Sequence, residues 1–144
     1  MMGVCFGHQA IARALGGEVR KYEGGFGAGV RASYVLDEGM KDYFHDGAMH
    51  LLYSHHDQVM TLPEGAVLCA TSDFCHNESF RMGNQVITFQ GHPEFTVAYS
   101  RHLLNNHCDD VDEAVRLAAL QSLDSQTPQG PEAARYALDL LFQN

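Results

Sequence analysis

The stretch Gly3-Val4-Cys5-Phe6-Gly7-His8-Gln9 decides the fold, because it predicts a strand, a sharp turn and a helix in immediate succession. Glycines stand two residues before and two residues after Cys5, which is the spacing of a G-x-S-x-G nucleophile elbow with cysteine in place of serine. Tight backbone geometry at such a turn leaves no room for flanking side chains, and the turn lifts the nucleophile out of the sheet. The following helix directs free N–H groups at the sulfur, so we expect it to favour the thiolate and a nearby oxyanion.

Beyond the elbow, the pattern changes from strand-rich to helix-rich. Apolar, β-branched and aromatic segments predict strands over residues 30–36, 50–54, 66–71, 78–82 and 85–90, the last two joined by a Gly83-Asn84 hairpin. Helical patterns predict helices over residues 7–15, 96–106 and 111–123, and from Pro131 onward with an apolar face of Ala134, Ala137, Leu138, Leu141 and Phe142. This order favours an α/β fold, a sheet with flanking helices.

The bulk composition excludes several classes of protein. With 144 residues and a 45% hydrophobic fraction, the chain is expected to form a single soluble domain over residues 1–144. A net charge of −9 argues against nucleic-acid and membrane partners and favours a small molecule or a protein. No transmembrane run or signal segment is recognisable, so a cytoplasmic location is expected. Four scattered cysteines indicate reduced thiols, and we expect Cys69, Cys75 and Cys108 to be structural.

A cysteine nucleophile needs a base, and residues 91–95 (GHPEF) supply the best candidate. They follow an apolar predicted strand, and the carboxyl ends of strands are where open α/β sheets place their ligands. Pro93 fixes the turn, so His92 and Glu94 can hold an imidazole against a carboxylate. A lone cysteine or histidine is more often structural, but the two motifs together are much more specific. They predict Cys5 as nucleophile, His92 as proton carrier and Glu94 as the group that orients the ring.

Together these two motifs resemble those of the class I glutamine amidotransferases, which use a Cys-His-Glu triad. Residues 54–59 (SHHDQV) through 62–65 (LPEG) are similar to the amidotransferase domain of GMP synthase. Residues 90–96 (QGHPEFT) and the helical tail are closer to stand-alone members that include γ-glutamyl peptidases. The resemblance extends from the elbow to the C-terminus. It implies a three-layer open sheet of flavodoxin-like type, truncated at the N-terminus and followed by a helical C-terminal tail.

The resemblance implies hydrolysis of glutamine without a cofactor or a metal. In the family, the cysteine attacks the side-chain amide of L-glutamine or a γ-glutamyl compound, and water hydrolyses the resulting thioester. At matching positions, the Phe6 backbone N–H supplies half of the oxyanion hole and Gln9 helps to bind glutamine. Ser54 and His55 match the stretch whose backbone holds the amino-acid end of the substrate. The ammonia acceptor belongs to a synthase subunit or domain that this sequence does not identify.

The sequence departs from the family at its start. Family members carry several strands and helices before the elbow, with a glycine-bearing loop that donates the second oxyanion N–H, whereas this sequence starts at Met1. Loss of one such donor typically costs about 10²–10³ in rate. Missing neighbours would also leave the elbow strand as an unpaired apolar edge. The expectation is a truncated product with poor activity, or a start codon misplaced within a longer reading frame.

Three alternatives remain open from the sequence. The chain could be a non-catalytic fragment or interaction module that retains the motifs by descent, or a free-standing γ-glutamyl peptidase. A metal site would have to use residues such as His55-His56-Asp57 or Cys75-His76, but neither a C-x-x-C pair nor an H-E-x-x-H spacing occurs. Adjacent histidines are ordinarily solvated loop residues or hydrogen-bonded neighbours of a pocket.

Overall fold

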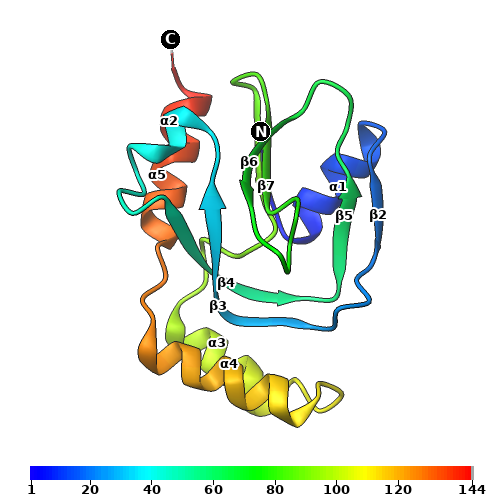
Figure 1. The fold of residues 1–144 in the computed structure, drawn as a ribbon, viewed down its shortest axis with the longest axis vertical. Helices are drawn as coiled ribbons and strands as arrows, with labels where there is room; N and C mark the ends of the chain where they lie inside the picture. Colours follow the sequence, from blue (N-terminus) through cyan, green and yellow to red (C-terminus); the bar gives the residue numbers. More distant parts are fainter. Residues whose placement is uncertain (144) are drawn as a thin grey trace.

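The computed structural model describes residues 1–143, which form eight strands and five helices (Figure 1). The strands are β1 (Met2–Val4), β2 (Glu18–Lys21), β3 (Gly27–Val35), β4 (Ala48–His55), β5 (Asp57–Thr61), β6 (Val67–Thr71), β7 (Ser79–Met82) and β8 (Val86–Phe89). The helices are α1 (Phe6–Ala14), α2 (Glu38–Lys41), α3 (Val97–Asn106), α4 (Glu113–Ser125) and α5 (Gly130–Leu141). In this part of the chain, no helix has both the length and the apolar character needed to cross a bilayer.

Six of the strands form one mixed sheet in the order β1-β8-β7-β6-β3-β4. β1 and β8 are parallel, whereas the other adjacent strands are antiparallel. Val4 pairs with Phe89, so β1 and β8 end at the same level. The elbow after β1 and the GHPEF turn after β8 therefore leave the same edge of the sheet side by side, and the expected α/β fold is confirmed.

The β3–β4 ribbon bends away from the rest of this sheet. β3 pairs with β4 from Gly27 to Tyr34, but it pairs with β6 at Tyr34 and Val35 alone. The free half of the ribbon runs below the ends of the other strands (Figure 1). It brings the last residues of β4 beneath the elbow, which matters for the site. β2 and β5 form a separate antiparallel sheet of two strands, which the sequence patterns did not predict.

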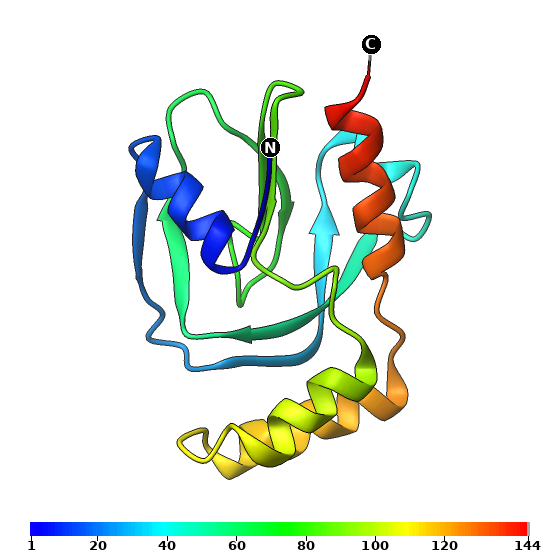
Figure 2. The same cartoon turned by 180° about the vertical axis from the view of Figure 1, so that it is seen from behind.

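The helices bury three apolar clusters. Figure 2 shows α1 and α5 in front of the strands, with the α3–α4 pair crossing below the ribbon. Ala12 of α1 packs with Val59 and Phe80. The α3–α4 pair covers β3 and β4 through Leu104, Ala119 and Leu123, which contact Ala28, Val30 and Leu52. The largest cluster lies between α5 and the main sheet and contains Phe44, Met49, Leu51, Tyr53, Cys69, Cys75, Ile87 and Phe89.

The helix ends agree with the sequence better than one helix face does. Thr96 caps α3 by accepting a hydrogen bond from the Tyr99 N–H, as predicted. The predicted apolar face of α5 is confirmed in part: Ala137 is buried and Leu141 packs against the core, but Leu138 and Phe142 are 55% and 74% exposed. Ala133 and Tyr136, which were not predicted, are buried beside Ala137, so the buried face is shifted toward them. The Tyr136 hydroxyl on this face donates to Asp37 Oδ1.

Candidate active site

Cys5 occupies the strained turn that the elbow motif predicts. Its φ of 49° and ψ of −104° make it the one non-glycine residue with positive φ among residues 1–143. Its backbone N–H donates to Phe89 O at 2.9 Å, which ties the turn to the end of β8. Such strain persists where the surrounding structure fixes it, and it is typical of functional sites.

The two glycines of the elbow differ in what they allow. A Cβ at Gly3 would lie 2.6 Å from Ile11 Cδ1 and 2.8 Å from Gly7 O, so the strand and the helix can approach each other only at a glycine. A Cβ at Gly7 would meet nothing within 4 Å. The expectation that neither flanking position has room for a side chain therefore holds at Gly3 and is wrong at Gly7.

The sulfur of Cys5 lies among polar groups from three segments. Gln90 Nε2 donates to Sγ at 3.6 Å, and Sγ lies 3.9 Å from the carbonyl oxygen of Ser54. Burial raises the pKa of the Cys5 thiol above its usual value. The Phe6 N–H and Gln90 oppose this rise, while the carboxyl groups of Glu94 and Glu78 add to it. The helix end thus favours the thiolate as expected, but burial outweighs it, and the resting thiol needs a base.

His92 and Glu94 form a close pair after β8. His92 Nδ1 lies 2.7 Å from Glu94 Oε1, so a neutral imidazole carries its proton on Nδ1 and leaves Nε2 as the free base. The imidazole is 12% exposed and stacks on Phe95 with ring centroids 3.8 Å apart. The His92 backbone N–H donates to Leu52 O at 2.8 Å. β4 therefore contacts both halves of the site, through Leu52 and Ser54.

The four residues expected to bind substrate are placed differently from one another. The Phe6 side chain is 79% exposed, while its N–H acts on the Cys5 sulfur. Gln9 is buried, and its amide is used in hydrogen bonds to other groups of the protein. The backbone carbonyl oxygen of Ser54 lies 3.9 Å from the sulfur of Cys5. The His55 ring is 5% exposed and packs against Tyr53 and Phe74, and burial lowers its pKa to about 3.

Two further residues belong to this region and were not predicted from the sequence. Gln90 contacts the Cys5 sulfur, and Glu78 lies beneath the turn that carries His92. Glu78 has no exposed surface, and its carboxylate accepts hydrogen bonds from the Gly91 N–H, at 3.0 Å, and from the Tyr53 hydroxyl. The position of Gln90 directly before the GHPEF turn was the one available signal. Glu78 carries no signal in the sequence, because its partners lie 13 and 25 residues away.

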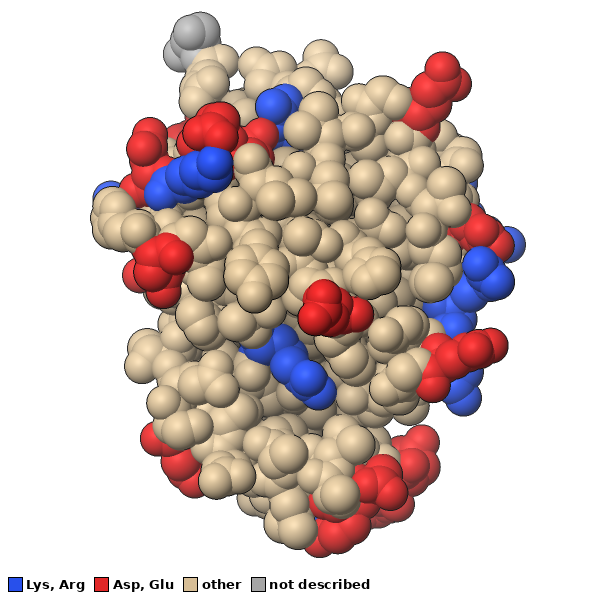
Figure 3. Space-filling view, viewed as in Figure 1, with Lys and Arg blue, Asp and Glu red and all other residues tan. Residues whose placement is uncertain are grey.

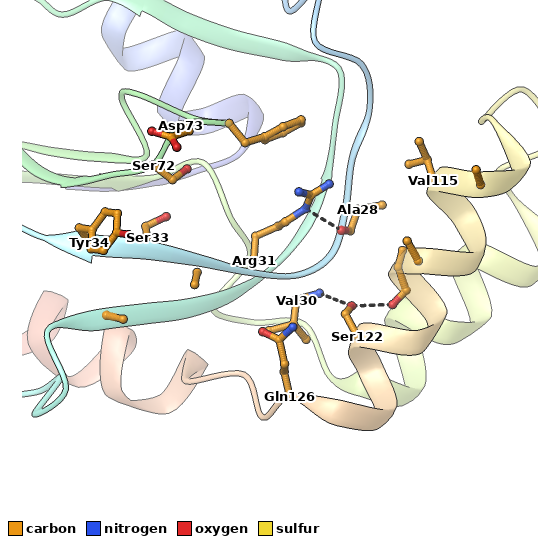
Figure 4. Close-up of a pocket in the computed structure, with 16 residues that line it drawn as sticks. Ala28, Val30, Arg31, Ser33, Tyr34, Ser72, Asp73, Val115, Ser122 and Gln126 are labelled. Atoms are coloured by element: carbon orange, nitrogen blue, oxygen red, sulfur yellow. Dashed lines mark hydrogen bonds between the residues drawn. The ribbon is translucent and has the colours of Figure 1, made fainter.

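A separate cavity of about 750 Å³ lies between β3, α4 and the turn after β6 (Figure 4). Arg31 points into it with its guanidinium 4.5 Å from the centre of the Phe74 ring, and Asp73 lies opposite (Figure 4). None of the triad residues lines this cavity. On the face shown in Figure 3, Lys and Arg side chains are scattered rather than joined in a continuous patch. Residues 1–143 contain no group of three His, Cys, Asp or Glu side chains able to hold a metal ion.

Comparison with known proteins identifies the family. The model of the family "Glutamine amidotransferase class-I" matches residues 1–111, which is most of the chain. The chain belongs to the class I glutamine amidotransferases. It is 36% identical over 101 residues to gamma-glutamyl peptidase 3 of Arabidopsis thaliana, covering 66% of this chain and 41% of that protein. It is 33% identical over 95 residues to a glutamine-hydrolysing GMP synthase subunit of Methanosphaera stadtmanae, covering 65% and 50%.

Solved structures agree on the fold. A glutamine amidotransferase from Methylobacillus flagellatus superimposes with a TM-score of 0.72 at 20% identity, covering 97% of this chain and 62% of that one. At this identity the likeness concerns the architecture, including the curled mixed sheet and the helical C-terminal segment. The chain therefore spans half or less of these two curated relatives and less than two thirds of the solved structure.

Proposed function

We propose that this chain carries the thiol and the base of a glutamine amidotransferase site, which cleaves the side-chain amide of L-glutamine or of a γ-glutamyl compound. The observation that supports this most directly is that the carboxyl ends of β1 and β8 lie next to each other. Because the two strands are parallel neighbours of equal extent, Cys5 and the His92–Glu94 pair lie at the same edge of the sheet. Cys-His pairs of this kind activate a nucleophile in acyl transfer, and the third group orients the base.

The reaction follows from these groups. His92 Nε2 takes the proton of Cys5 as Sγ bonds to the amide carbon. The C–N bond then breaks and the nitrogen leaves with the proton from His92, so ammonia departs and a γ-glutamyl thioester remains. A water molecule, deprotonated by His92, attacks the thioester, and the C–S bond breaks to release glutamate and restore the thiol. Glu94 holds the ring and stabilises the imidazolium in both steps.

The substrate-binding assignments belong to the same proposal. The Phe6 N–H is one oxyanion donor, because it already lies near the Cys5 sulfur. The backbone at Ser54 and His55 is a candidate to hold the amino-acid end of the substrate, since Ser54 O is 3.9 Å from Sγ. The relative named as a GMP synthase subunit favours a synthase partner that accepts the ammonia.

The test is ammonia release from glutamine by the purified chain and by Cys5→Ala. We expect the substitution to lower the rate by at least about 10³-fold, because the nucleophile is lost. Cys108→Ser is the matched control: it changes another buried thiol, in the cluster beneath β3 and β4, and should leave the rate within about twofold. A folded wild-type chain that releases no ammonia would favour the non-catalytic alternative, whereas a Cys5→Ala variant with wild-type activity would exclude Cys5 as the nucleophile.

The γ-glutamyl peptidase alternative is supported by the relative of that name. It differs from the glutaminase in the leaving group, which is an amino acid or a peptide rather than ammonia. Both reactions require Cys5, so Cys5→Ala does not separate them. Comparing glutamine with glutathione as substrates does. A kcat/KM for glutathione above that for glutamine would assign the chain as a peptidase.

A further inference from the structure

Gln90 lies fully buried between Gln9 and the nucleophile. Its Nε2 is 3.6 Å from the Cys5 sulfur, and its Oε1 accepts a hydrogen bond from Gln9 Nε2 at 3.0 Å. Gln9 Nε2 also donates to the backbone carbonyl of Asp57 at 2.7 Å. These contacts form a chain of amides that begins at a backbone oxygen of β5 and ends at the sulfur.

The hydrogen bonds in this series can have only one donor-to-acceptor direction. A backbone carbonyl accepts hydrogen bonds and never donates them, so Gln9 must turn its NH₂ group, and not its oxygen, toward Asp57. The second hydrogen of the same NH₂ group then requires an acceptor, which is Gln90 Oε1. Gln90 is left with its own NH₂ group facing Sγ. The amide orientations, which are ordinarily assigned from such networks, are therefore set by one fixed acceptor.

We propose that Gln90 is a catalytic residue, which donates a hydrogen bond to the sulfur of Cys5 in its thiolate form, and that Gln9 is a positioning residue, which fixes the orientation of the Gln90 amide. The catalytic role of Gln90 rests on the proposed function, in which Cys5 is the nucleophile. For Gln9, this gives a second role beside the expected contact with glutamine.

The surroundings of Cys5 explain why such a donor matters. Burial and the carboxyl groups of Glu94 and Glu78 all disfavour a negative charge on the sulfur. The Phe6 N–H and the Gln90 amide are the groups that oppose them, and both donate. The sulfur carries charge twice in the reaction, when His92 removes its proton and when the C–S bond of the thioester breaks. Gln90 stabilises the thiolate at both points.

The test measures the pH dependence of Cys5 alkylation by iodoacetamide, read by mass spectrometry of the peptide that contains Cys5. This reagent reports the thiolate and requires no turnover. In Gln90→Leu, which removes the donor, we expect the thiol pKa to rise and the alkylation rate near neutral pH to fall by about tenfold, the usual effect of losing a hydrogen bond to a charged group. Gln90→Glu places a carboxylate against the sulfur and should lower the rate further.

Gln9→Glu tests the donor-to-acceptor direction of these hydrogen bonds without a substitution at any residue that touches Cys5. A carboxylate at position 9 cannot donate to Gln90, so the Gln90 amide turns and presents its oxygen to the sulfur. We expect the pKa of the Cys5 thiol to rise as in Gln90→Leu. The double variant Gln9→Glu/Gln90→Leu should raise this pKa no more than Gln90→Leu does alone. Gln58→Leu is the matched control, because Gln58 is a buried amide that donates to Phe74 O. Circular dichroism establishes that each variant is folded.

An unchanged alkylation profile in folded Gln90→Leu would overturn the proposal. A shift in Gln90→Leu without one in Gln9→Glu would overturn the part that concerns Gln9. Failure of the proposed function gives a different pattern. The variants would then show the expected alkylation shifts, but the wild-type chain would hydrolyse neither glutamine nor glutathione. That result would support the hydrogen bond to Cys5 and contradict the proposed reaction.

Discussion

Glu78 combines complete burial with direct support of the site. Its carboxylate accepts from the Gly91 N–H, and its backbone carbonyl accepts from the Gln90 N–H at 2.7 Å. Burial raises the pKa of this carboxyl group to about 7, against hydrogen bonds from Tyr53, Gly91 and Cys75 that favour ionisation. The residue that anchors the turn before His92 therefore changes its charge near neutral pH.

This shift predicts a pH dependence of stability. In the unfolded chain Glu78 titrates near 4.5, so the folded form is favoured below that pH and loses this contribution as the pH rises toward 7. The difference between these two pKa values corresponds to about 3 kcal/mol. Urea unfolding at a series of pH values should show the free energy of unfolding of the wild type falling by roughly this amount relative to Glu78→Gln between pH 4.5 and 7.5. Parallel profiles for the two proteins would contradict the shift.

At this scale, the site residues proposed from the sequence are those that belong to a local motif. Cys5 lies between its two glycines, and His92 is two residues from Glu94. Gln90 and Glu78 act through partners that the fold brings together across the chain, 85 residues apart for Gln90 and Cys5. Neither periodicity nor spacing reports such a contact, so these roles required the structure.

The contact between β3 and α4 depends on one glycine. Gly29 has a φ of +72°, and a Cβ there would lie 2.4 Å from Ser122 Oγ and 2.8 Å from the Cα of Ala119. Ser122 in turn accepts a hydrogen bond from the Val30 N–H at 2.9 Å and donates to Ala119 O (Figure 4). Its hydroxyl thus satisfies a backbone group on the part of β3 that pairs with β4 on one side and has no strand on the other.

Gly29→Ala should therefore destabilise the protein more than backbone strain alone would. We expect a loss of about 3 kcal/mol, combining left-handed strain with displacement of α4. Gly25→Ala is the control, since Gly25 also has positive φ, at +99°, but a Cβ there meets nothing within 4 Å. It should cost about 1 kcal/mol. Equal losses in urea unfolding of the two variants would show that α4 does not depend on the close approach.

Among the elements, prediction succeeded where apolar residues repeat and failed where pairing decides. The strands of the main sheet and the helices were anticipated to within about three residues at most ends. β2 was not, because its residues are mostly exposed and polar and it exists through pairing with β5. No strand was expected after His55, yet the chain continues there into β5. The hairpin at Gly83 was anticipated, although its loop contains three residues because Met82 pairs with Val86.

At the scale of the whole molecule, β1 is the outer strand of the six-stranded sheet. It pairs with β8 on one side, and within residues 1–143 no strand lies on its other side. Alternate residues of a strand direct their backbone groups to opposite sides, and the Cys5 N–H and Met1 O face β8. The backbone groups of Met2 and Val4 consequently face the open edge. Two apolar side chains are exposed here, Met2 on β1 at 39% and Phe6 at the start of α1 at 79%.

An open apolar edge predicts association of the 144-residue chain with itself through strand pairing. Sedimentation velocity over a range of concentrations should show a monomer giving way to larger species. Met2→Lys should shift this transition to higher concentration, because a charged residue on an edge strand opposes pairing. Leu117→Lys makes the same change on the exposed surface of α4, where Leu117 is 53% exposed, and should not shift it. If both lysine variants reduced association equally, the effect would come from net charge, which is −9 in the wild type, and the edge would not be the contact.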